Sequence, residues 1–358
     1  MTDRTVILVF SYGTTLEDWR RLGLLERQAA LLDALRERFS RVVLMTYGGP
    51  ADAAISAGPR VEVCTRPRWC PRPLYAVLAP WLHRRVYRSA RVCYAQQLSA
   101  AITVAAGKLM FGTPFVVRCG FPWRAFARHL RRWDLWAVSW IAEQVTCRMA
   151  DGIIQTADYG LRSRGSVIIP NGVDLQRFAP SAGRCPGLIC WTGRMAEQKN
   201  LELLLRAVAG LPGIRLRLIG DGPYRQQLVT LAQSLEVDVE WIGRVPNDEL
   251  PRHLQEASLF VFPSRYEGDP KALLEAMACA LPVIASDIPE HRSIIRPGEN
   301  GLLSPLKAEA LRRHIQQILG EPLLGDRLGQ AARRWVEDHR ELGRALRQEC
   351  QTLMEVMK

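Results

Sequence analysis

The chain lacks any apolar run long enough to span a bilayer. Arg or Pro interrupts its longest hydrophobic stretches, whereas a membrane-spanning helix needs about 20 consecutive apolar residues. Residues 1–4 lead directly into a strand-like run at 5–10, and this beginning does not have the pattern of a secretory signal. We therefore expect a cytoplasmic protein.

Patterns for metal binding and disulfides are also missing. The nine cysteines show no repeated short spacing, and an odd number in mostly apolar or helical settings indicates reduced thiols. Cys64 and Cys70, with only His83 nearby, make a poor zinc set, so we expect no metal and no cofactor. The histidines are interpreted as surface helix or loop residues without a role: His83, His129, His253, His291, His314 and His339.

Two functional classes are disfavoured by absent motifs. No strand-like run is followed by G-x-G-x-x-G, which argues against an NAD-dependent oxidoreductase. No motif supports nucleic-acid binding, although the chain is basic. With 358 residues, 48% hydrophobic and 23% charged, the composition is that of a globular protein with room for two domains.

The positive charge is concentrated in the first half. Residues 1–170 contain 24 Lys and Arg against 12 Asp and Glu, whereas residues 171–358 contain 24 of each. The whole formal net charge of +12 therefore belongs to the first half, which suits an anionic partner.

Strand and helix patterns alternate along both halves, which is typical of α/β proteins with doubly wound parallel sheets. In the first half, we expect strands at 6–10, 42–45, 61–64, 92–94, 114–117, 153–156 and 167–169, and helices at 24–39 and 100–109. In the second half, we expect strands at 188–192, 216–219, 239–242 and 259–262, helices at 201–208, 224–235 and 248–257, and a long terminal helix at 326–358. A Pro-, Gly- and Ser-containing linker is expected at 178–187.

The most informative feature is a pair of carboxylates, Glu267 and Glu275, beside a strand-to-helix junction. Asp269 and Pro270 predict the N-cap and first position of the helix. Glu267 then lies in the loop at the carboxyl end of the strand, where open α/β sheets bind ligands. The pair could accept hydrogen bonds from hydroxyls at two points on a sugar-rich ligand. Taken alone, it could equally be a pair of solvated surface residues.

A second feature is a pair of cations after the strand at 188–192. Arg194 and Lys199 lie between that strand and the next helix, where backbone donors and the helix dipole favour an anion. Arg can bind phosphate oxygens in a fork while Lys adds a point charge, so the pair suits a diphosphate. The alternative is two surface cations.

These residues resemble the signatures of retaining GT-B glycosyltransferases, in particular glycosyltransferase family 4 (group 1 type). Glu267 and Glu275 match the family's E-x7-E motif. Further matches lie at 169–174, 218–223, 276–286, with Ala280 where Gly is usual, and 297–303. The resemblance is dense over 165–305 and thin before it.

The resemblance implies a GT-B fold, in which two Rossmann-like domains face each other across a cleft. We expect an acceptor-binding domain at 1–178, a nucleotide-sugar-binding domain at 179–340, and a terminal helix at 341–358 that packs back on the first domain. The family relation further implies metal-independent transfer of a hexosyl group.

The resemblance also implies roles for individual residues of the second domain. Arg194, Lys199 and Glu267 are the expected catalytic residues: the two cations would neutralise the departing diphosphate, and Glu267 would contact the donor sugar. Glu275 would accept hydrogen bonds from the nucleotide ribose. The remaining donor-binding candidates here are Gly193, Arg244, Gly268, Asp269, Pro270 and Leu274. Most relatives have an apolar residue at the position of Asp269, so its carboxylate either caps the helix, which we prefer, or alters donor choice.

The first domain carries weaker signals. Gly13 and Thr14 occupy the place of the family's Gly-rich loop facing the diphosphate. Trp19 either lines the acceptor site or anchors this loop, the second being favoured. The family's usual His after a mid-domain strand is missing, and Arg118 stands as its substitute on the acceptor side or as a structural ion-pair partner. Cys119 is interpreted as a structural thiol rather than a nucleophile.

Two first-domain segments, at 66–85 and 121–140, combine Trp with Arg. This combination suits peripheral contact with an anionic membrane, in addition to a lipid-linked acceptor. The alternative is that Trp133, Trp136 and Trp140 form a core stripe of one helix, and we expect that stripe to be mostly core.

The sequence thus predicts a retaining glycosyltransferase that uses a UDP- or GDP-linked sugar and a saccharide or lipid-linked acceptor. Its expected place is the inner face of the bacterial cytoplasmic membrane, in polysaccharide, lipopolysaccharide or glycolipid biosynthesis. The alternatives are a nucleotide-sugar 2-epimerase of similar architecture and a non-catalytic sugar-nucleotide-binding protein.

Overall fold

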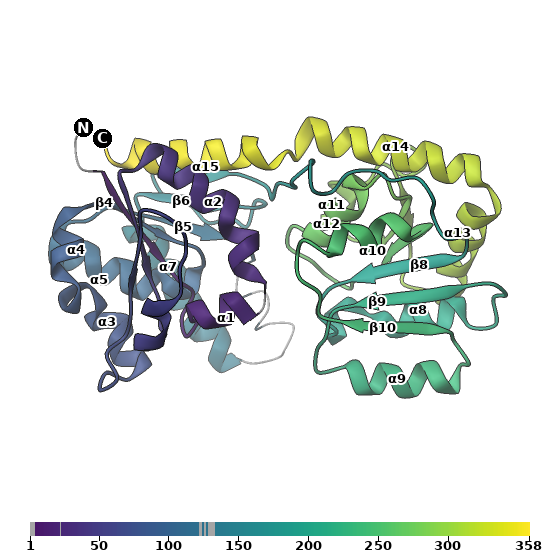
Figure 1. Ribbon diagram of the computed structural model, residues 1–358, viewed down its shortest axis with the longest axis horizontal. Helices are drawn as coiled ribbons and strands as arrows, with labels where there is room; N and C mark the ends of the chain where they lie inside the picture. Colours follow the sequence, from purple (N-terminus) through teal and green to yellow (C-terminus); the bar gives the residue numbers. More distant parts are fainter. Residues whose placement is uncertain (1–3, 22, 122–123, 125–126, 128–132) are drawn as a thin grey trace. The chain divides into compact units, whose positions relative to one another are not determined.

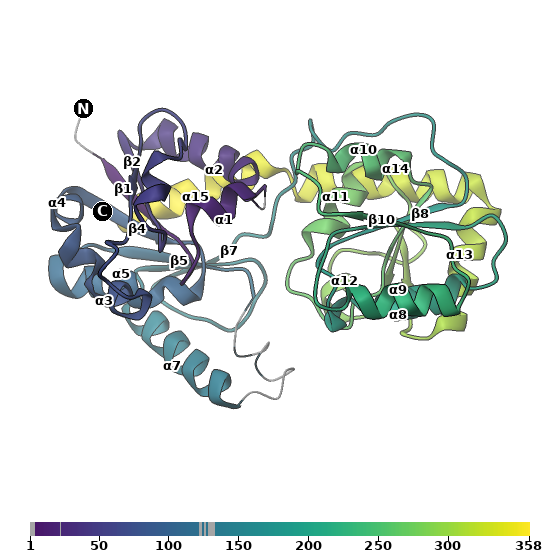
Figure 2. The ribbon, with the colours of Figure 1, turned by 60° about the horizontal axis from the view of Figure 1, so that its bottom comes forward.

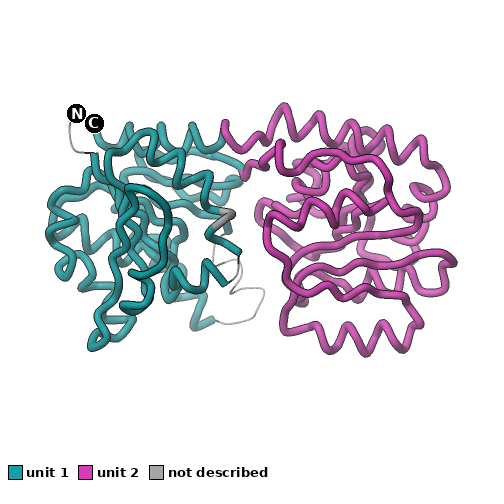
Figure 3. The backbone as a smooth tube through the Cα atoms, viewed as in Figure 1, with its two compact units in different colours: residues 1–170, 345–358 teal, residues 171–344 magenta. Residues whose placement is uncertain are grey.

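A computed structural model describes residues 4–358 apart from 22, 122–123, 125–126 and 128–132 (Figure 1). Pro122, Trp123, Arg128, His129, Arg131 and Arg132, which entered the sequence analysis, lie outside the described residues. The chain divides into two compact units, residues 1–170 with 345–358 and residues 171–344 (Figure 3).

The boundary between the units lies at 170/171 and not in the predicted linker at 178–187. The linker prediction is wrong because this segment is attached to the second unit. Phe178 is buried in its core, and Arg333 donates hydrogen bonds to the carbonyls of Phe178 and Leu175, at 2.6 and 3.2 Å. A Pro- and Gly-containing composition therefore marks an irregular segment here and not a domain border.

The first unit is a parallel sheet with helices on both faces (Figure 2). Its strands pair in the order β3-β2-β1-β4-β5-β6-β7. The strands are β1 Thr5–Val9, β2 Arg41–Met45, β3 Val61–Cys64, β4 Ala90–Ala95, β5 Phe115–Cys119, β6 Gly152–Gln155 and β7 Gly165–Ile168. The helices are α1 Leu16–Arg21, α2 Leu24–Arg38, α3 Arg72–Leu82, α4 Arg84–Ser89, α5 Ala101–Phe111, α7 Trp133–Met149 and α15 Leu342–Val356.

Two apolar cores lie on the two faces of this sheet. One is built under α3, α4 and α5, with partly buried residues of α7 packed against it. The other is built under α1 and α2 and includes Cys350 and Leu353 of α15. Residues 345–358 therefore belong to the first unit, although they follow the second unit in the chain.

The second unit is also a doubly wound parallel sheet, with strand order β10-β9-β8-β11-β12-β13. Its strands are β8 Leu188–Thr192, β9 Arg215–Ile219, β10 Val239–Gly243, β11 Leu259–Phe262, β12 Val283–Ser286 and β13 Leu302–Ser304. Its helices are α8 Leu201–Val208, α9 Arg225–Ser234, α10 Leu250–Glu256, α11 Lys271–Ala278, α12 Pro289–Arg292, α13 Ala308–Gly320 and α14 Pro322–His339. Strands β8 and β11 are fully buried.

The long terminal helix expected at 326–358 is in fact two helices, α14 and α15, separated at residues 340–341. The backbone leaves the helical conformation there to pair with Val173: the Val173 amide donates to the Arg340 carbonyl at 2.8 Å, and the Leu342 amide donates to the Val173 carbonyl at 3.0 Å. Glu341 then accepts the amides of Gly343 and Arg344 at the start of α15. Hydrogen bonds to a distant segment thus break the helix.

Candidate functional site

The predicted second-unit site lies where the strand order of the sheet reverses. β8 continues through α8 to β9 on one side, whereas β11 pairs with β8 on the other. The loops at 193–200 and 263–270 leave the carboxyl ends of these neighbouring strands. Ligands of open α/β sheets bind at such a switch point.

The structure brings Lys199 and Glu267 into direct contact. Lys199 Nζ lies 2.5 Å from Glu267 Oε1 and 5.0 Å from the centre of the Phe262 ring. Gln198 reinforces the contact between the two loops. Its side-chain NH2 donates to the Tyr266 backbone carbonyl, and its backbone carbonyl accepts the Arg265 amide, both at 2.8 Å. Two predicted catalytic groups are therefore fixed against each other at the switch point.

Arg194 differs from Lys199 in being exposed. Within the part of the chain that the structure describes, its guanidinium has no hydrogen-bond or ion-pair partner. It follows Gly193, whose φ of 153° is outside the range that side-chain-bearing residues favour. Glu267 balances the charge of Lys199, whereas Arg194 has no counter-charge among the described residues.

A second glycine-containing turn, after β9, supports the loop that carries Arg194. A Cβ on Gly220 would lie 1.9 Å from the Gly193 carbonyl oxygen, and one on Gly222 would lie 2.2 Å from the Met195 carbonyl oxygen. The Met195 amide donates to the Asp221 carbonyl at 3.0 Å. This turn, which lies in one of the segments that match the family, therefore holds the neighbouring loop in place.

Asp269 does not cap the helix, contrary to the preferred prediction. Helix α11 begins at Lys271, with Pro270 at the N-cap and no side-chain capping bond. The Asp269 carboxylate, 4% exposed, instead lies 3.0 Å from Arg340 Nη1 and accepts the Asn171 amide at 2.5 Å. Both partners are distant in sequence, so no local pattern could have indicated them.

The remaining donor-binding candidates of this unit lie on three elements. Glu275 is buried in the second turn of α11, and Leu274 beside it is fully buried in the core. Gly268 is half-buried in the loop after β11, and Arg244 is exposed after β10. The side chain of Leu274 therefore supports the helix from inside and does not face a ligand.

His291 is completely buried, so its assignment as a surface residue is wrong. Its Nδ1 lies 2.8 Å from the Ser286 carbonyl oxygen, which places the proton on Nδ1, and its buried Nε2 has no partner among the described residues. The ring packs against Phe262, the residue below Lys199. Burial lowers the pKa of His291, which keeps a further positive charge away from Lys199.

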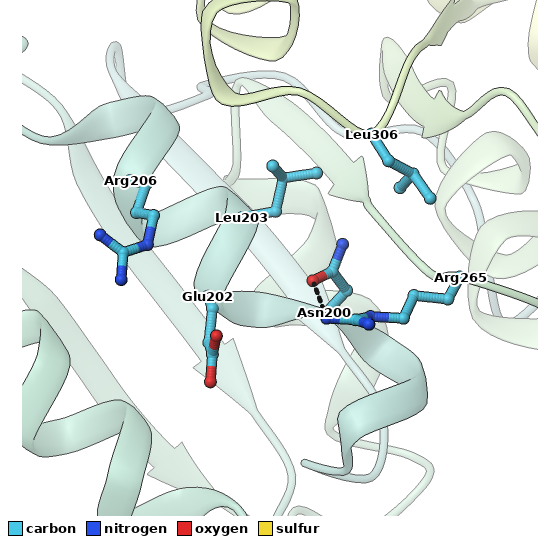
Figure 4. A pocket seen from close by; sticks show the side chains of 6 residues that line it. All are labelled: Asn200, Glu202, Leu203, Arg206, Arg265 and Leu306. Carbon is cyan, nitrogen blue, oxygen red and sulfur yellow. Dashed lines mark hydrogen bonds between the residues drawn. The ribbon is translucent and has the colours of Figure 1, made fainter.

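An open hollow of about 420 Å³ lies beside the site (Figure 4). Its lining residues are Asn200, Glu202, Leu203, Arg206, Arg265 and Leu306, and Arg265 donates to the Asn200 side chain at 3.4 Å. It includes neither member of the Lys199–Glu267 pair, and we assign it no role.

In the first unit, Gly13 and Thr14 follow β1, next to β4, where the order of that sheet reverses. Gly13 has φ 80°, and the Thr14 amide donates to the Ser11 carbonyl at 3.0 Å. The amides of Leu16 and Glu17, at the start of α1, donate to Asp52 at 2.6 and 3.3 Å. A carboxylate of the chain itself thus occupies this helix start.

Both acceptor-side candidates, Trp19 and Arg118, make contacts within the first unit. Trp19 is buried and stacked on Phe10, with ring centres 3.9 Å apart, which agrees with the interpretation as a loop anchor. Arg118 forms an ion pair with the buried Glu349 of α15, and Glu349 also accepts the Tyr94 hydroxyl at 2.6 Å. Arg118 therefore has the structural role that the sequence analysis left open.

The tryptophan stripe of α7 is not core, contrary to expectation. Trp133 and Trp140 are 67% and 43% exposed. Helix α5 packs against both α7 and α3, and all three helices carry exposed apolar side chains: Leu74, Val77 and Trp81 on α3, Ile102, Leu109 and Met110 on α5, and Trp133, Val138, Trp140 and Ile141 on α7. Spacing of three and four residues placed these tryptophans on one face but did not reveal that Trp133 and Trp140 are exposed in the folded chain.

The described residues contain no group of His, Cys, Asp or Glu able to hold a metal ion, and no described helix has the length and apolar character to cross a membrane. All nine cysteines are free thiols. Burial raises the pKa of the Cys119 thiol to about 12, which opposes a nucleophilic role.

Comparisons with known proteins show sequence similarity over part of the chain. Residues 175–335 match the family model described as glycosyl transferases group 1. A GDP-mannose-dependent phosphatidylinositol monomannoside mannosyltransferase of Mycolicibacterium smegmatis is 29% identical over 48% of this chain and 51% of its own length. The putative colanic acid glycosyltransferase WcaL of Salmonella typhimurium is 31% identical over 41% of this chain and 40% of its own. The chain thus spans about half or less of the length of these curated relatives.

The similarity to solved structures extends over the whole chain. The sucrose-phosphate synthase of Thermosynechococcus elongatus matches with a TM-score of 0.80, at 20% identity and 99% coverage of both chains. Anabaena HepE in complex with UDP matches with a TM-score of 0.78, at 18% identity, over 98% of this chain and 100% of its own. These matches confirm the predicted α/β fold with two Rossmann-like domains, the GT-B fold. Residues 175–335 of this chain are thus similar in sequence to the group 1 glycosyltransferases.

Proposed function

We propose that this protein is a retaining glycosyltransferase that transfers a hexosyl group from a UDP- or GDP-linked sugar to a saccharide or lipid-linked acceptor. The observation that carries the proposal is the contact between Lys199 and Glu267 at the switch point of a group 1 domain. It places a cation suited to a diphosphate beside a carboxylate suited to sugar hydroxyls, as one sugar nucleotide requires. The similar structure of Anabaena HepE has been determined in complex with UDP and with UDP-glucose, which supports a nucleotide-linked donor.

In the proposed reaction, the bond between the anomeric carbon and the diphosphate breaks while the acceptor oxygen bonds to the same face of the sugar. The acceptor proton passes to a diphosphate oxygen. Arg194 and Lys199 stabilise the negative charge that develops on the leaving group, an electrostatic task that proceeds without a metal. Glu267 positions the donor sugar, and Glu275 accepts hydrogen bonds from the ribose.

The donor assignment is tested by thermal stabilisation with UDP-, GDP- and ADP-linked sugars. A ligand at one hundred times its dissociation constant stabilises the folded state by about 2.7 kcal/mol. We expect UDP- or GDP-linked sugars to raise the melting temperature, Glu275→Ala to abolish the rise, and Glu267→Ala to lower turnover more than nucleotide binding. An unchanged nucleotide affinity in Glu275→Ala would refute the role of Glu275.

The two alternatives differ in products. A 2-epimerase would isomerise or hydrolyse the donor without an acceptor, whereas a non-catalytic binding protein would bind it and leave it intact. Incubating donor with and without a saccharide acceptor, followed by mass spectrometry, separates the three cases. The proposal expects acceptor-dependent release of the nucleoside diphosphate.

We further propose that the first unit contacts an anionic membrane. This contact would bring the enzyme to a lipid-linked acceptor at the inner face of the cytoplasmic membrane. Its product would then serve polysaccharide, lipopolysaccharide or glycolipid biosynthesis. Thirteen Lys and Arg residues, and no Asp or Glu, lie between Glu62 and Asp134. The exposed apolar side chains of α3, α5 and α7 belong largely to this stretch. Apolar side chains flanked by cations suit an anionic bilayer surface.

Flotation with liposomes tests the membrane contact. We expect binding to vesicles that contain anionic lipid, weakened by salt, and reduced by Leu109→Ser on α5. Leu323→Ser is the matched control, because Leu323 is at least as exposed as Leu109 but lies on α14 of the second unit. Equal binding by both variants, or no preference for anionic lipid, would contradict the proposal.

A further inference from the structure

The loop that carries Glu267 is attached to both segments by which the chain enters and leaves the second unit. Asn171 is the first residue of that unit, and Arg340 precedes its last residue, Arg344, by four positions. The Asp269 carboxylate contacts both: it accepts the Asn171 amide at 2.5 Å, and its two oxygens lie 3.0 and 3.1 Å from Arg340 Nη1. One side chain, two residues from Glu267, thus joins three segments that are distant in sequence.

The two crossing segments, 171–173 and 340–342, are also paired with each other. The Val173 amide donates to the Arg340 carbonyl, and the Leu342 amide donates to the Val173 carbonyl. Their backbones approach so closely that a Cβ on Gly172 would lie 2.5 Å from the Leu342 Cα. The Asn171 side chain adds a hydrogen bond of 2.9 Å to the Asp269 carbonyl. The crossing segments and the loop therefore form one connected network.

Burial makes this network sensitive to its charges. The side chains of Asp269 and Arg340 are 4% and 10% exposed. When one partner of such a buried ion pair is removed, the charge that remains is left unpaired, which is strongly destabilising. A change in the loop backbone at Asp269 therefore cannot occur without disturbing Asn171 or Arg340. The reverse holds as well: displacement of either crossing segment alters the partner set of Asp269.

We propose that Asp269 is a positioning residue that couples the order of the donor loop to the order of the two crossing segments. The inference rests on the proposed function, in which the loop with Glu267 and Gly268 contacts the donor sugar. Asp269 does not touch the reacting atoms in this account. It fixes the loop backbone so that Glu267 is held for the sugar, and it makes that placement depend on the pairing of 171–173 with 340–342.

The first test uses hydrogen–deuterium exchange on the protein without ligand. Asp269→Asn keeps an oxygen acceptor but removes the ion pair, and Arg340→Gln removes it from the other side. We expect exchange at the Val173 and Leu342 amides to accelerate roughly 10- to 100-fold in both variants, which corresponds to a lost charged hydrogen bond. Asp326→Asn is the matched control, because it removes an exposed pair with Arg184 at the other end of α14. Unchanged exchange at both amides would overturn the proposal.

The second test asks whether the crossing segments affect the loop. UDP, UDP-glucose, GDP and GDP-mannose serve as probes, and calorimetry gives the affinity of each sugar nucleotide relative to its nucleotide. We expect Asp269→Asn and Arg340→Gln each to reduce that relative affinity about tenfold. Arg340→Lys, which keeps a positive charge opposite Asp269, should reduce it less. Gly172→Ala, which alters no atom of the loop, should reduce it as well, and it remains informative if Asp269→Asn does not fold.

The two tests separate the failure of this inference from that of the proposed function. A merely structural role for Asp269 would weaken nucleotides and sugar nucleotides by the same factor, and that result would overturn the coupling. If no probe binds the wild-type protein, the proposed function fails, while the exchange measurement still decides whether Asp269 connects the two crossing segments to the loop.

Discussion

In the first unit, the loop after β1 leads into α1, whose first amides donate to the buried carboxylate of Asp52. In the second unit, the loop after β8 carries Arg194, which is exposed and has no partner among the described residues. Both loops stand at the switch point of a parallel sheet. In the first unit the chain supplies its own anion, and in the second it leaves a cation available. Of the two, the second is therefore the better prepared for an external anion.

The largest expected effect comes from removing the internal anion. Asp52 accepts the amides of Leu16 and Glu17 and the hydroxyl of Thr46, and each buried donor left unsatisfied costs about 1 to 3 kcal/mol. We expect Asp52→Ala to lower the free energy of unfolding by about 3 to 5 kcal/mol, as measured in urea. Asp52→Asn, which keeps an oxygen acceptor, should lose less. A wild-type stability in Asp52→Ala would show that α1 does not depend on this carboxylate.

The opposite behaviour is expected of Arg194. Because Arg194 has no partner among the residues that the structure describes, Arg194→Ala should change the free energy of unfolding by less than about 0.5 kcal/mol. The affinity for a nucleoside diphosphate, measured by calorimetry, should fall roughly 10- to 100-fold, which corresponds to the free energy of one hydrogen bond between charged groups. Arg206→Ala, another exposed arginine of the second unit, is the control. Equal affinities for both variants would remove Arg194 from the site.

A smaller effect is expected from the turn that supports the loop of Arg194. Gly222→Ala places a Cβ within 2.2 Å of the Met195 carbonyl oxygen, so the loop must shift, at a cost of about 1 to 3 kcal/mol. Nucleotide affinity should fall together with stability. At Gly320, a Cβ meets nothing within 4 Å, and Gly320→Ala should leave nucleotide affinity unchanged. If Gly222→Ala binds nucleotide like the wild type, the turn does not position the loop.

The smallest effect concerns pH. Burial lowers the pKa of His291 below its ordinary value of 6.5. Just below pH 6.5, the imidazole is therefore protonated more in the unfolded chain than in the native state. The contribution of His291 to stability is therefore present above about pH 6.5 and is lost as the pH falls below it. Between pH 7.5 and 5.5, the wild type should lose more unfolding free energy than His291→Gln. Parallel pH profiles would contradict this assignment.

The sequence predicted the elements of the second unit well because its signals are local. Strands β8 and β11 and helix α8 have the expected bounds, since a buried apolar run defines each strand and amphipathic spacing defines the helix. The contact of Lys199 with Glu267 was not itself predicted, but it agrees with the adjacent roles assigned to them from the family resemblance.

The errors share one cause, namely partners that are distant in sequence. Asp269 was assigned to the helix that follows it, whereas Asn171 and Arg340 are its partners. Asp52 received no role, because nothing around it predicts contact with α1. The spacing of the tryptophans on α7 identified a common face, but only the tertiary structure shows that this face is exposed. Burial and long-range pairing are properties of the folded chain.

The central claim is that the switch point of the second unit binds a nucleoside diphosphate sugar through Arg194, Lys199, Glu267 and Glu275. Calorimetric titration of UDP-glucose and GDP-mannose into the wild type, Lys199→Ala and Glu275→Ala tests it most directly. The account predicts binding of at least one donor by the wild type, at least tenfold weaker binding by Lys199→Ala, and no measurable binding by Glu275→Ala. Donor binding of equal strength in all three proteins would contradict it.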